Sequence, residues 1–391
     1  MDFEFWWLLA FPLFFGLGWI AARIDIKHLV RESRALPRSY FKGLNFLLNE
    51  QPDQAIEAFI EAVKVDPQTV ELHFALGNLF RRRGEFDRAI RMHQNLVDRD
   101  DLAEEKRLAA LEELGHDYLK AGLLDRAENV FVKLRGTSRD ETALKFLLDI
   151  YEQEKEWGKA IEIARNLPDH SGYLWQKEVA NFLCELAAQE ITDSRFDEAR
   201  RYIAEALATN RKCVRASILL GDLEAVAGDP EAAVDAWKRI EQQNPVYLAL
   251  VADKLMDAYR KLGRDEQGVQ LLRGYLERHS SLDLLDAVFE SELNAGGPDE
   301  AYQLVRDELK RNPTLLGLDK LLEAQILVAP PERRPDLELV KNLIHSHTRR
   351  VARYRCGECG FKARQFYWRC PACGGWETYP PKRTEEFDLA P

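Results

Sequence analysis

The stretch from Gly43 to Pro67, GLNFLLNEQPDQAIEAFIEAVKVDP, decides the fold. Its small and bulky residues keep a helical spacing, with Ala55 twelve residues after Gly43 and Phe59 four residues after Ala55. A small residue where two helices cross lets their backbones approach closely, and a bulky residue one turn later fills the neighbouring groove. The stretch therefore predicts two antiparallel helices joined by a turn.

The same register recurs along the chain. A small residue returns in the expected second helix eight times, at spacings of 33 to 39 residues. These residues are Ala55, Ala89, Ala127, Ala160, Ala199, Ala233, Gly268 and Ala301. Turn-forming stretches precede some of the second helices, as in Gly228-Asp229-Pro230. We therefore expect an all-α fold with about eight helical pairs over residues 36–314.

This register resembles the tetratricopeptide repeat family. The resemblance implies a superhelix whose concave face is lined by the first helices and binds peptides or protein surfaces. The residues expected on that face in the second and third repeats are Asn78, Arg81, Arg82, His116 and Lys120. They could bind acidic groups of a partner. The alternative is that the Arg81–Arg83 run is only a solvated group of charges.

Two further helices are expected after the repeats, over residues 315–350, where they would cap the array. Pro330, Pro331 and Pro335 interrupt the chain between them. Asp336 can cap the second of these helices, which we expect to run from Leu337 to about Thr348.

Four of the six cysteines form two Cys-x-x-Cys pairs in an expected domain at residues 351–380. The spacing is Cys356-x2-Cys359-x10-Cys370-x2-Cys373, and a glycine follows each pair. Four thiolates suit one tetrahedral zinc or iron ion, and glycine permits the positive φ that such a turn needs. About thirty residues cannot form an adequate core, so the metal would contribute much of the folding energy.

The other two cysteines, Cys184 and Cys213, lie in apolar helical patterns, and we expect them to be small buried core residues.

Aromatic residues surround the four clustered cysteines. They are Phe361, Phe366, Tyr367, Trp368, Trp376 and Tyr379. They would form the core of the small domain or a face that docks on the repeats, and either reading gives the metal a structural role. The domain also resembles rubredoxin, which uses iron for electron transfer, so an electron-transfer centre is the alternative. Nearby basic residues such as Arg364 would meet anionic lipid or an acidic partner, or only aid solubility.

The N-terminus predicts a membrane anchor at residues 1–23, followed by a juxtamembrane linker at 24–35. The segment FWWLLAFPLFFGLGWIAA, residues 5–22, carries no charge and would span about 27 Å as a helix. A cleaved signal peptide is disfavoured because Asp2 and Glu4 replace the usual positive residues. The basic flank after Arg23 predicts that the N-terminus is periplasmic and that the rest of the chain is cytoplasmic.

Composition and motifs limit the classes of function. The 391-residue chain has a net charge of −11, which argues against a general nucleic-acid binder. The sequence contains no P-loop, no G-x-S-x-G and no H-E-x-x-H motif, so we expect no enzymatic activity.

An anchor, a repeat array and a metal domain in this order resemble the lipopolysaccharide assembly protein B family of Gram-negative bacteria. The most specific part is CGECGFKARQFYWRCPACGGWETYP, residues 356–380, which leaves 381–391 as a tail. The resemblance implies that Cys356, Cys359, Cys370 and Cys373 bind the metal. It also implies a single-pass protein of the bacterial inner membrane.

The same resemblance implies an adaptor for the membrane-anchored ATP-dependent protease FtsH. Such an adaptor promotes turnover of the deacetylase that commits precursors to lipid A, and it contacts inner-membrane lipopolysaccharide sensor and export proteins. The alternatives are a membrane-tethered rubredoxin-type electron carrier and a generic peptide-binding co-chaperone. A homodimer stays open.

Overall fold

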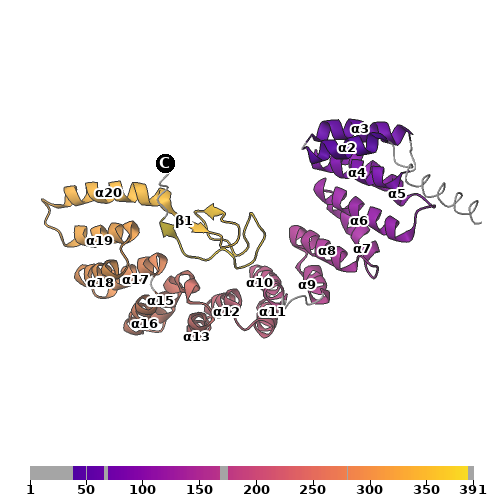
Figure 1. The fold of residues 1–391 in the computed structure, drawn as a ribbon. Coiled ribbons are helices and arrows are strands. Elements are labelled where there is room, and N and C mark those ends of the chain that lie inside the picture. Colours follow the sequence, from indigo (N-terminus) through magenta and orange to yellow (C-terminus); the bar gives the residue numbers. More distant parts are fainter. Residues whose placement is uncertain (1–37, 50, 66–68, 168–174, 280, 386–391) are drawn as a thin grey trace, which may run out of the picture. The chain divides into compact units, whose positions relative to one another are not determined.

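Helical hairpins make up most of the structure, a computed structural model of the chain (Figure 1). It describes residues 38–49, 51–65, 69–167, 175–279 and 281–385. The chain divides into two units, residues 1–153 and residues 154–391. The helices of the first unit are α2 (Arg38–Leu48), α3 (Pro52–Val65), α4 (Val70–Arg82), α5 (Phe86–Val97), α6 (Glu104–Lys120), α7 (Leu124–Leu134) and α8 (Asp140–Glu154).

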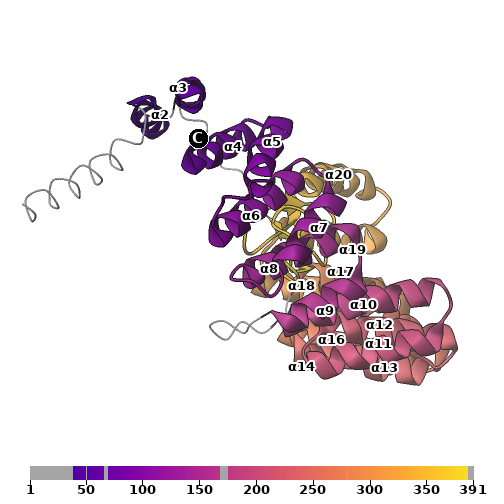
Figure 2. The same cartoon turned by 90° about the vertical axis from the view of Figure 1, so that its right-hand side faces the viewer.

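The second unit contains the remaining helices and a small sheet (Figures 1 and 2). Its helices are α9 (Trp157–Asn166), α10 (Gln176–Thr192), α11 (Phe196–Thr209), α12 (Val214–Ala227), α13 (Pro230–Lys238), α14 (Ile240–Gln243), η1 (Pro245–Leu250), α15 (Ala252–Lys261), α16 (Asp265–Arg278), α17 (Leu282–Ala295), α18 (Pro298–Arg311), α19 (Leu315–Val328) and α20 (Arg334–Val351). The strands are β1 (Ala352–Arg355), β2 (Lys362–Ala363) and β3 (Thr384–Glu385), in the antiparallel order β2-β1-β3.

The small residues that set the predicted register lie where the helices pack. They fall in the second helices α3, α5, α7, α9, α11, α13, α16 and α18. The seven alanines among them have no exposed surface, and Gly268 is buried as well. This arrangement confirms the helical-repeat prediction.

A glycine seated against a ring sixteen residues later fixes four of the hairpins. The pairs are Gly43 with Phe59, Gly77 with His93, Gly115 with Phe131, and Gly221 with Trp237. A Cβ atom added to Gly221 would lie 2.2 Å from Nε1 of Trp237, closer than any real contact. The ring therefore occupies the space that any other side chain would need, and the first helix must carry glycine there.

The second repeat places a polar ring at this position. His93 is fully buried, and its Nδ1 lies 2.5 Å from Oδ2 of Asp117 on α6. Asp117 is also fully buried, and its Oδ1 accepts a hydrogen bond of 2.9 Å from Arg81 on α4. Buried polar groups need such partners because an unsatisfied one is costly. These contacts join the second repeat to the third.

The predicted turn at residues 228–230 forms as its sequence indicates. Gly228 ends α12 in the left-handed region with φ of 88°. The Asp229 side chain then accepts a hydrogen bond from the Ala232 amide at the start of α13. A C-terminal glycine, a capping aspartate and a proline at the first helical position together stop one helix and start the next.

The last helix starts earlier than the sequence suggested. We expected Asp336 to cap a helix starting at Leu337, and this expectation is wrong because α20 begins at Arg334 with Asp336 inside its first turn. Pro335 is tolerated there, since the first helical residues have no intrahelical partner for their N–H groups.

None of the described helices is long and apolar enough to cross a membrane. The anchor predicted at residues 1–23 and the linker predicted at 24–35 lie outside the described residues, as does the tail from residue 386.

Replacing Gly221 with alanine should destabilise the second unit by about 1–3 kcal/mol, because the added Cβ would collide with Trp237. Gly158 in α9 is the matched control, since a Cβ there would meet nothing within 4 Å. Chemical denaturation of both variants measures the difference. If Gly221→Ala costs no more than Gly158→Ala, the close contact does not determine the packing.

Candidate metal centre

The four clustered cysteines converge on one point at the C-terminal end of the second unit. Their Sγ atoms all lie within 4.8 Å of one another, and the Cys356–Cys373 and Cys359–Cys370 pairs are 3.8 and 3.6 Å apart. A tetrahedral metal with bonds of about 2.3 Å to sulfur separates its ligand atoms by about 3.8 Å. The donor set and its spacing therefore fit one zinc or iron ion. We call residues 354–381 the knuckle.

Each Cys-x-x-Cys pair is closed by its following glycine, as predicted. Gly360 and Gly374 have φ of 75° and 73°. Their amides donate to the carbonyls of Cys356 and Cys370, at 3.1 and 2.9 Å. A residue with a Cβ would be strained in this left-handed region, so glycine lets the chain turn sharply around the sulfurs.

The protein environment prepares one thiol for ionisation but not all four. Burial opposes ionisation of Cys356, but the amides of Cys359 and Glu358 and the Thr378 hydroxyl lower its pKa to about 6. The amide of Phe361 favours the Cys359 thiolate, yet the neighbouring cysteines raise its pKa to about 12. A bound cation supplies the positive charge that lets four thiolates share one site.

Aromatic residues form the core of the knuckle. Tyr379 is fully buried, and its hydroxyl donates to the carbonyl of Tyr354 at 3.0 Å. Phe361 and Tyr367 pack around the Tyr379 ring. This cluster confirms the expectation that aromatic residues fill the small domain.

Other aromatic residues dock the knuckle on the repeats, against α9, α10 and η1. Trp368 stacks on Tyr247 of η1, with ring centroids 5.3 Å apart and an interplanar angle of 5°. Trp376 meets Trp157 of α9 and Phe182 of α10 edge to face. Some of the aromatic residues therefore form the core of the knuckle, whereas Trp368 and Trp376 form the face that docks on the repeats.

A buried arginine lies at the centre of this contact. The Arg215 guanidinium is 5.7 Å from the ring centroids of both Trp368 and Trp376. Only 9% of Arg215 is exposed, and Nη1 pairs with Glu185 at 2.8 Å. A desolvated cation between two indole rings gives a directional attraction in addition to apolar burial. Arg215 therefore joins α10 and α12 to the knuckle.

Hydrogen bonds fix the edges of the docked knuckle. The Asn181 side chain on α10 donates to Glu377 at 2.9 Å, and burial raises the pKa of Glu377. Beyond the knuckle, the Arg383 amide donates to Asp283 on α17 at 3.0 Å. Its guanidinium contacts Asp283 and also Asp286, at 3.0 Å from the latter. The C-terminal segment is thus tied to first helices on both sides of the metal site.

The sequence did not predict these docking residues on the repeats. Arg215, Asn181 and Asp283 stand in ordinary helical patterns, and their partners in the C-terminal segment lie 100 to 196 residues away. The one available signal was the density of aromatic residues around the cysteines, which indicated an apolar face but not what it contacts.

Three of the five residues predicted for partner binding already have partners within the first unit. Arg81 donates to Asn78 and Glu113, each at 2.6 Å, as well as to Asp117. Burial raises the pKa of Glu113, but His116 and Arg81 lower it to about 2. His116 also packs edge to face on a phenylalanine ring of α8, at 4.4 Å.

The other two predicted residues, Arg82 and Lys120, are exposed at the ends of α4 and α6. Binding of a partner by this group of five stays a prediction.

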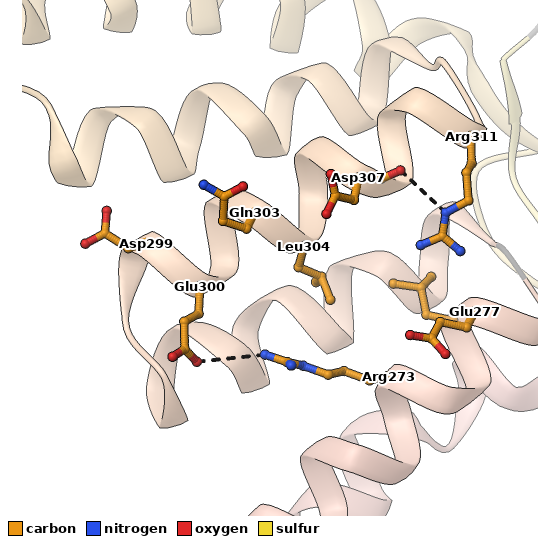
Figure 3. Close-up of a pocket in the computed structure, with 9 residues that line it drawn as sticks. Arg273, Glu277, Asp299, Glu300, Gln303, Leu304, Asp307 and Arg311 are labelled. Atoms are coloured by element: carbon orange, nitrogen blue, oxygen red, sulfur yellow. Dashed lines mark hydrogen bonds and ion pairs between the residues drawn. The ribbon is translucent and has the colours of Figure 1, made fainter.

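A cavity of about 460 Å³ lies between the second helices α16 and α18 (Figure 3). Its charged residues pair largely with one another or with neighbours. Arg273 contacts Glu300 at 3.8 Å and also reaches the buried Glu292, and Arg311 donates to the Asp307 carbonyl (Figure 3). These pairs give the walls of the cavity fixed charges. No residue of the knuckle lines this cavity.

Two family models match the chain. The model described as a rubredoxin metal binding domain matches residues 354–381, and the model described as a tetratricopeptide repeat matches residues 42–99 and 190–247. The resemblances to tetratricopeptide repeats and to rubredoxin are therefore confirmed.

Two relatives match over nearly the full length. Lipopolysaccharide assembly protein B of Escherichia coli (strain K12) is 34% identical over 385 residues, which cover 96% of this chain and 97% of that protein. The protein of the same name from Haemophilus influenzae is 31% identical over 392 residues, covering 97% of this chain and 98% of that protein.

Among solved structures, Naa15/Naa10 bound to HypK-THB contains a chain that is 16% identical, with a TM-score of 0.38. The match covers 79% of this chain and 53% of that one.

Replacing Cys370 with serine should abolish stoichiometric metal binding and unfold the knuckle, because three thiolates leave the site incomplete and the core is small. Elemental analysis of the purified full-length protein measures the metal, and limited proteolysis detects the exposed knuckle. Serine at Cys184, outside the cluster, is the control and should leave metal content unchanged. Full metal occupancy in Cys370→Ser would contradict the assigned ligand set.

Replacing Arg215 with alanine should release the knuckle from the repeats while leaving all four ligands in place. Loss of the contacts with both indole rings and with Glu185 should weaken docking by about 2 kcal/mol. Hydrogen exchange of the amides in residues 354–381, followed together with metal content, measures the release. Arg364, an exposed knuckle residue, gives the control variant Arg364→Ala. Equal protection in both variants would rule out a docking role for Arg215.

Proposed function

The chain belongs to the lipopolysaccharide assembly protein B family, and we propose that it acts in lipopolysaccharide assembly as a membrane-tethered adaptor without catalytic activity of its own. The observation that carries this proposal is the identity of 34% over 96% of the chain, a span that includes both the repeats and the knuckle. The helical repeats support it, since arrays of this kind present long surfaces to other proteins.

In this proposal the adaptor brings a membrane-anchored protease and the deacetylase that it degrades together. It binds the protease FtsH and the deacetylase that commits precursors to lipid A, promotes turnover of the deacetylase, and responds to lipopolysaccharide sensor and export proteins. The apolar segment at residues 5–22 would hold the repeats at the inner membrane, with the N-terminus periplasmic and the bulk cytoplasmic. Tethering raises the effective concentration of the repeats near membrane-bound partners, so a modest affinity suffices.

The knuckle restricts where such partners can bind. It lies against α9, α10, α12 and η1 of the second unit, and Arg383 continues these contacts to α17. In the first unit, the first helices α4 and α6 carry the exposed cations Arg82 and Lys120. We therefore place the proposed binding of an acidic partner segment on the first unit and assign the metal a structural role.

A second candidate function is electron transfer, and one observation favours it. Cys359 and Cys373 are exposed while Cys356 and Cys370 are buried, so one edge of the metal site faces solvent. An exposed ligand edge is what electron exchange with a partner requires. Visible absorbance of the purified protein separates the two functions, because a colourless zinc-loaded protein that supports normal lipopolysaccharide levels needs no redox metal.

Reversing the charges of Arg82 and Lys120 together should weaken capture of FtsH and the deacetylase by roughly tenfold, equivalent to about 1.4 kcal/mol. Detergent-solubilised pull-down of the full-length protein followed by quantitative mass spectrometry measures the capture. Arg91, exposed on the second helix α5, provides the control variant Arg91→Glu.

Three outcomes of the pull-down are informative. Loss of both partners in the double variant but not in Arg91→Glu supports the adaptor and its binding surface. Unchanged capture in both variants would exclude Arg82 and Lys120 as the binding surface but would still agree with an adaptor function. Capture of unrelated unfolded chains without the protease or the deacetylase would replace the adaptor with a general co-chaperone.

A further inference from the structure

Cys184 and Cys213 lie against each other in the core of the second unit. Their Sγ atoms are 3.8 Å apart, and neither residue has exposed surface. Cys184 is in the middle of α10, whereas Cys213 occupies the position directly before α12. The two thiols are 29 residues apart in sequence with α11 between them, so the contact joins one repeat to the next.

The two cysteines lie next to residues that hold the docked knuckle. Asn181, less than one helical turn before Cys184, binds Glu377 of the knuckle. Arg215, two residues after Cys213, lies beside Trp368 and Trp376. The Glu377 carboxylate is also near enough to act on both thiols electrostatically. The helices that hold the two cysteines are therefore the same helices that hold the knuckle.

The two thiols differ in their readiness to ionise. The hydrogen bond with Cys184 lowers the pKa of Cys213, and the Ala216 amide at the start of α12 lowers it further. The same hydrogen bond and burial raise the pKa of Cys184. Cys213 is thus the sulfur that carries negative charge more easily, and Cys184 is the sulfur that keeps its proton. The thiolate is the attacking species in thiol–disulfide exchange.

We propose that Cys184 and Cys213 form a reversible disulfide by exchange with a low-molecular-weight disulfide, and that the docked knuckle shields the pair from this reaction. The Cys213 thiolate attacks one sulfur of the small disulfide, breaks its S–S bond and releases one thiolate. The Cys184 sulfur, after losing its proton to solvent, then attacks Cys213 and displaces the second thiolate. Two protein thiols are oxidised, and one small disulfide is reduced to two thiols.

The geometry allows the bond with a limited movement. The Sγ atoms must approach from 3.8 Å to about 2.05 Å. Cys213 is at a helix end, after a short loop that begins at Asn210, so it can adjust more easily than a residue within a helix. Complete burial normally makes a thiol inert, so in this proposal the reaction requires the knuckle to leave.

Because the knuckle covers the pair in this proposal, the oxidation of Cys184 and Cys213 depends on the metal site. While the metal holds the knuckle folded, Trp376 and Glu377 stay over α10 and α12 and the thiols stay reduced. When the knuckle detaches, the pair becomes accessible and its oxidation records the event as a covalent link between two repeats.

The test uses full-length, metal-loaded protein incubated with oxidised glutathione and then alkylated. Mass spectrometry of unreduced peptides follows the Cys184–Cys213 cross-link over time. We expect the link to form at least tenfold faster in Trp376→Ala than in the wild type. Trp376→Ala keeps all four metal ligands, so the other thiols do not compete. Wild type treated with a chelator provides a second route to a detached knuckle, should Trp376→Ala fold poorly.

The Arg364→Ala variant and protein unfolded in urea are the controls. Arg364→Ala should react as slowly as the wild type. Both detached forms should react faster than the urea sample, because folded helices hold the sulfurs in contact. Cys184→Ser combined with Trp376→Ala should trap Cys213 as a mixed disulfide with glutathione.

Each alternative result overturns a defined part of the proposal. Equal rates of cross-link formation in the wild type and Trp376→Ala would show that the docked knuckle does not protect the pair. Mixed disulfides with glutathione on both cysteines, without the cross-link, would rule out a Cys184–Cys213 disulfide. Reaction of the detached forms no faster than in urea would assign any cross-link to the unfolded chain.

Discussion

A ring seated directly on a glycine backbone determines how the two helices cross in four hairpins of this array. At Gly221 of α12, the indole of Trp237 from α13 occupies the space of a Cβ. The indole Nε1 also donates a hydrogen bond to the carbonyl of Ile218, which is on α12 as well. The contact therefore fixes both the separation and the rotation of α12 against α13. Since Arg215 lies on α12, that rotation also determines whether its guanidinium meets the knuckle. The position of the metal site on the repeats thus depends on helix packing that contains no metal ligand.

The parts of the structure that the sequence predicted correctly are those specified by local spacing. Alanines at about 34-residue intervals must lie at helix crossings, and two Cys-x-x-Cys-Gly turns can present four sulfurs to one ion without any other information. The docked face was not predictable in this way. Asn181 and Glu377 are 196 residues apart, and nothing in either local pattern indicates the other. The start of α20 was misjudged for a different reason, because a proline reads as a break although the first helical turn accepts it.

The second unit uses buried charge where a larger domain would use apolar area. The knuckle is too small to bury much surface, so directional contacts supplement its aromatic contacts. Arg215 contacts Trp376, Glu377 accepts a hydrogen bond from a side chain of α10, and Arg383 donates to α17. Such contacts lose energy sharply when one partner shifts, in contrast to apolar contacts, which tolerate small movements. Docking of the knuckle is consequently specific but easily disturbed, and metal binding and repeat packing support each other.

The buried histidine of the second repeat constrains how this chain can change over generations. His93, Asp117 and Arg81 come from three helices, and the fully buried Asp117 carboxylate contacts both His93 and Arg81. A phenylalanine at position 93 would restore the ring found in the neighbouring repeats but would deprive the Asp117 carboxylate of one of its two partners. An apolar residue at position 117 would have the converse effect on His93 and Arg81. The three positions must therefore be inherited as a group, and a lineage can leave this arrangement only through substitutions that occur together or through an intermediate of lower stability.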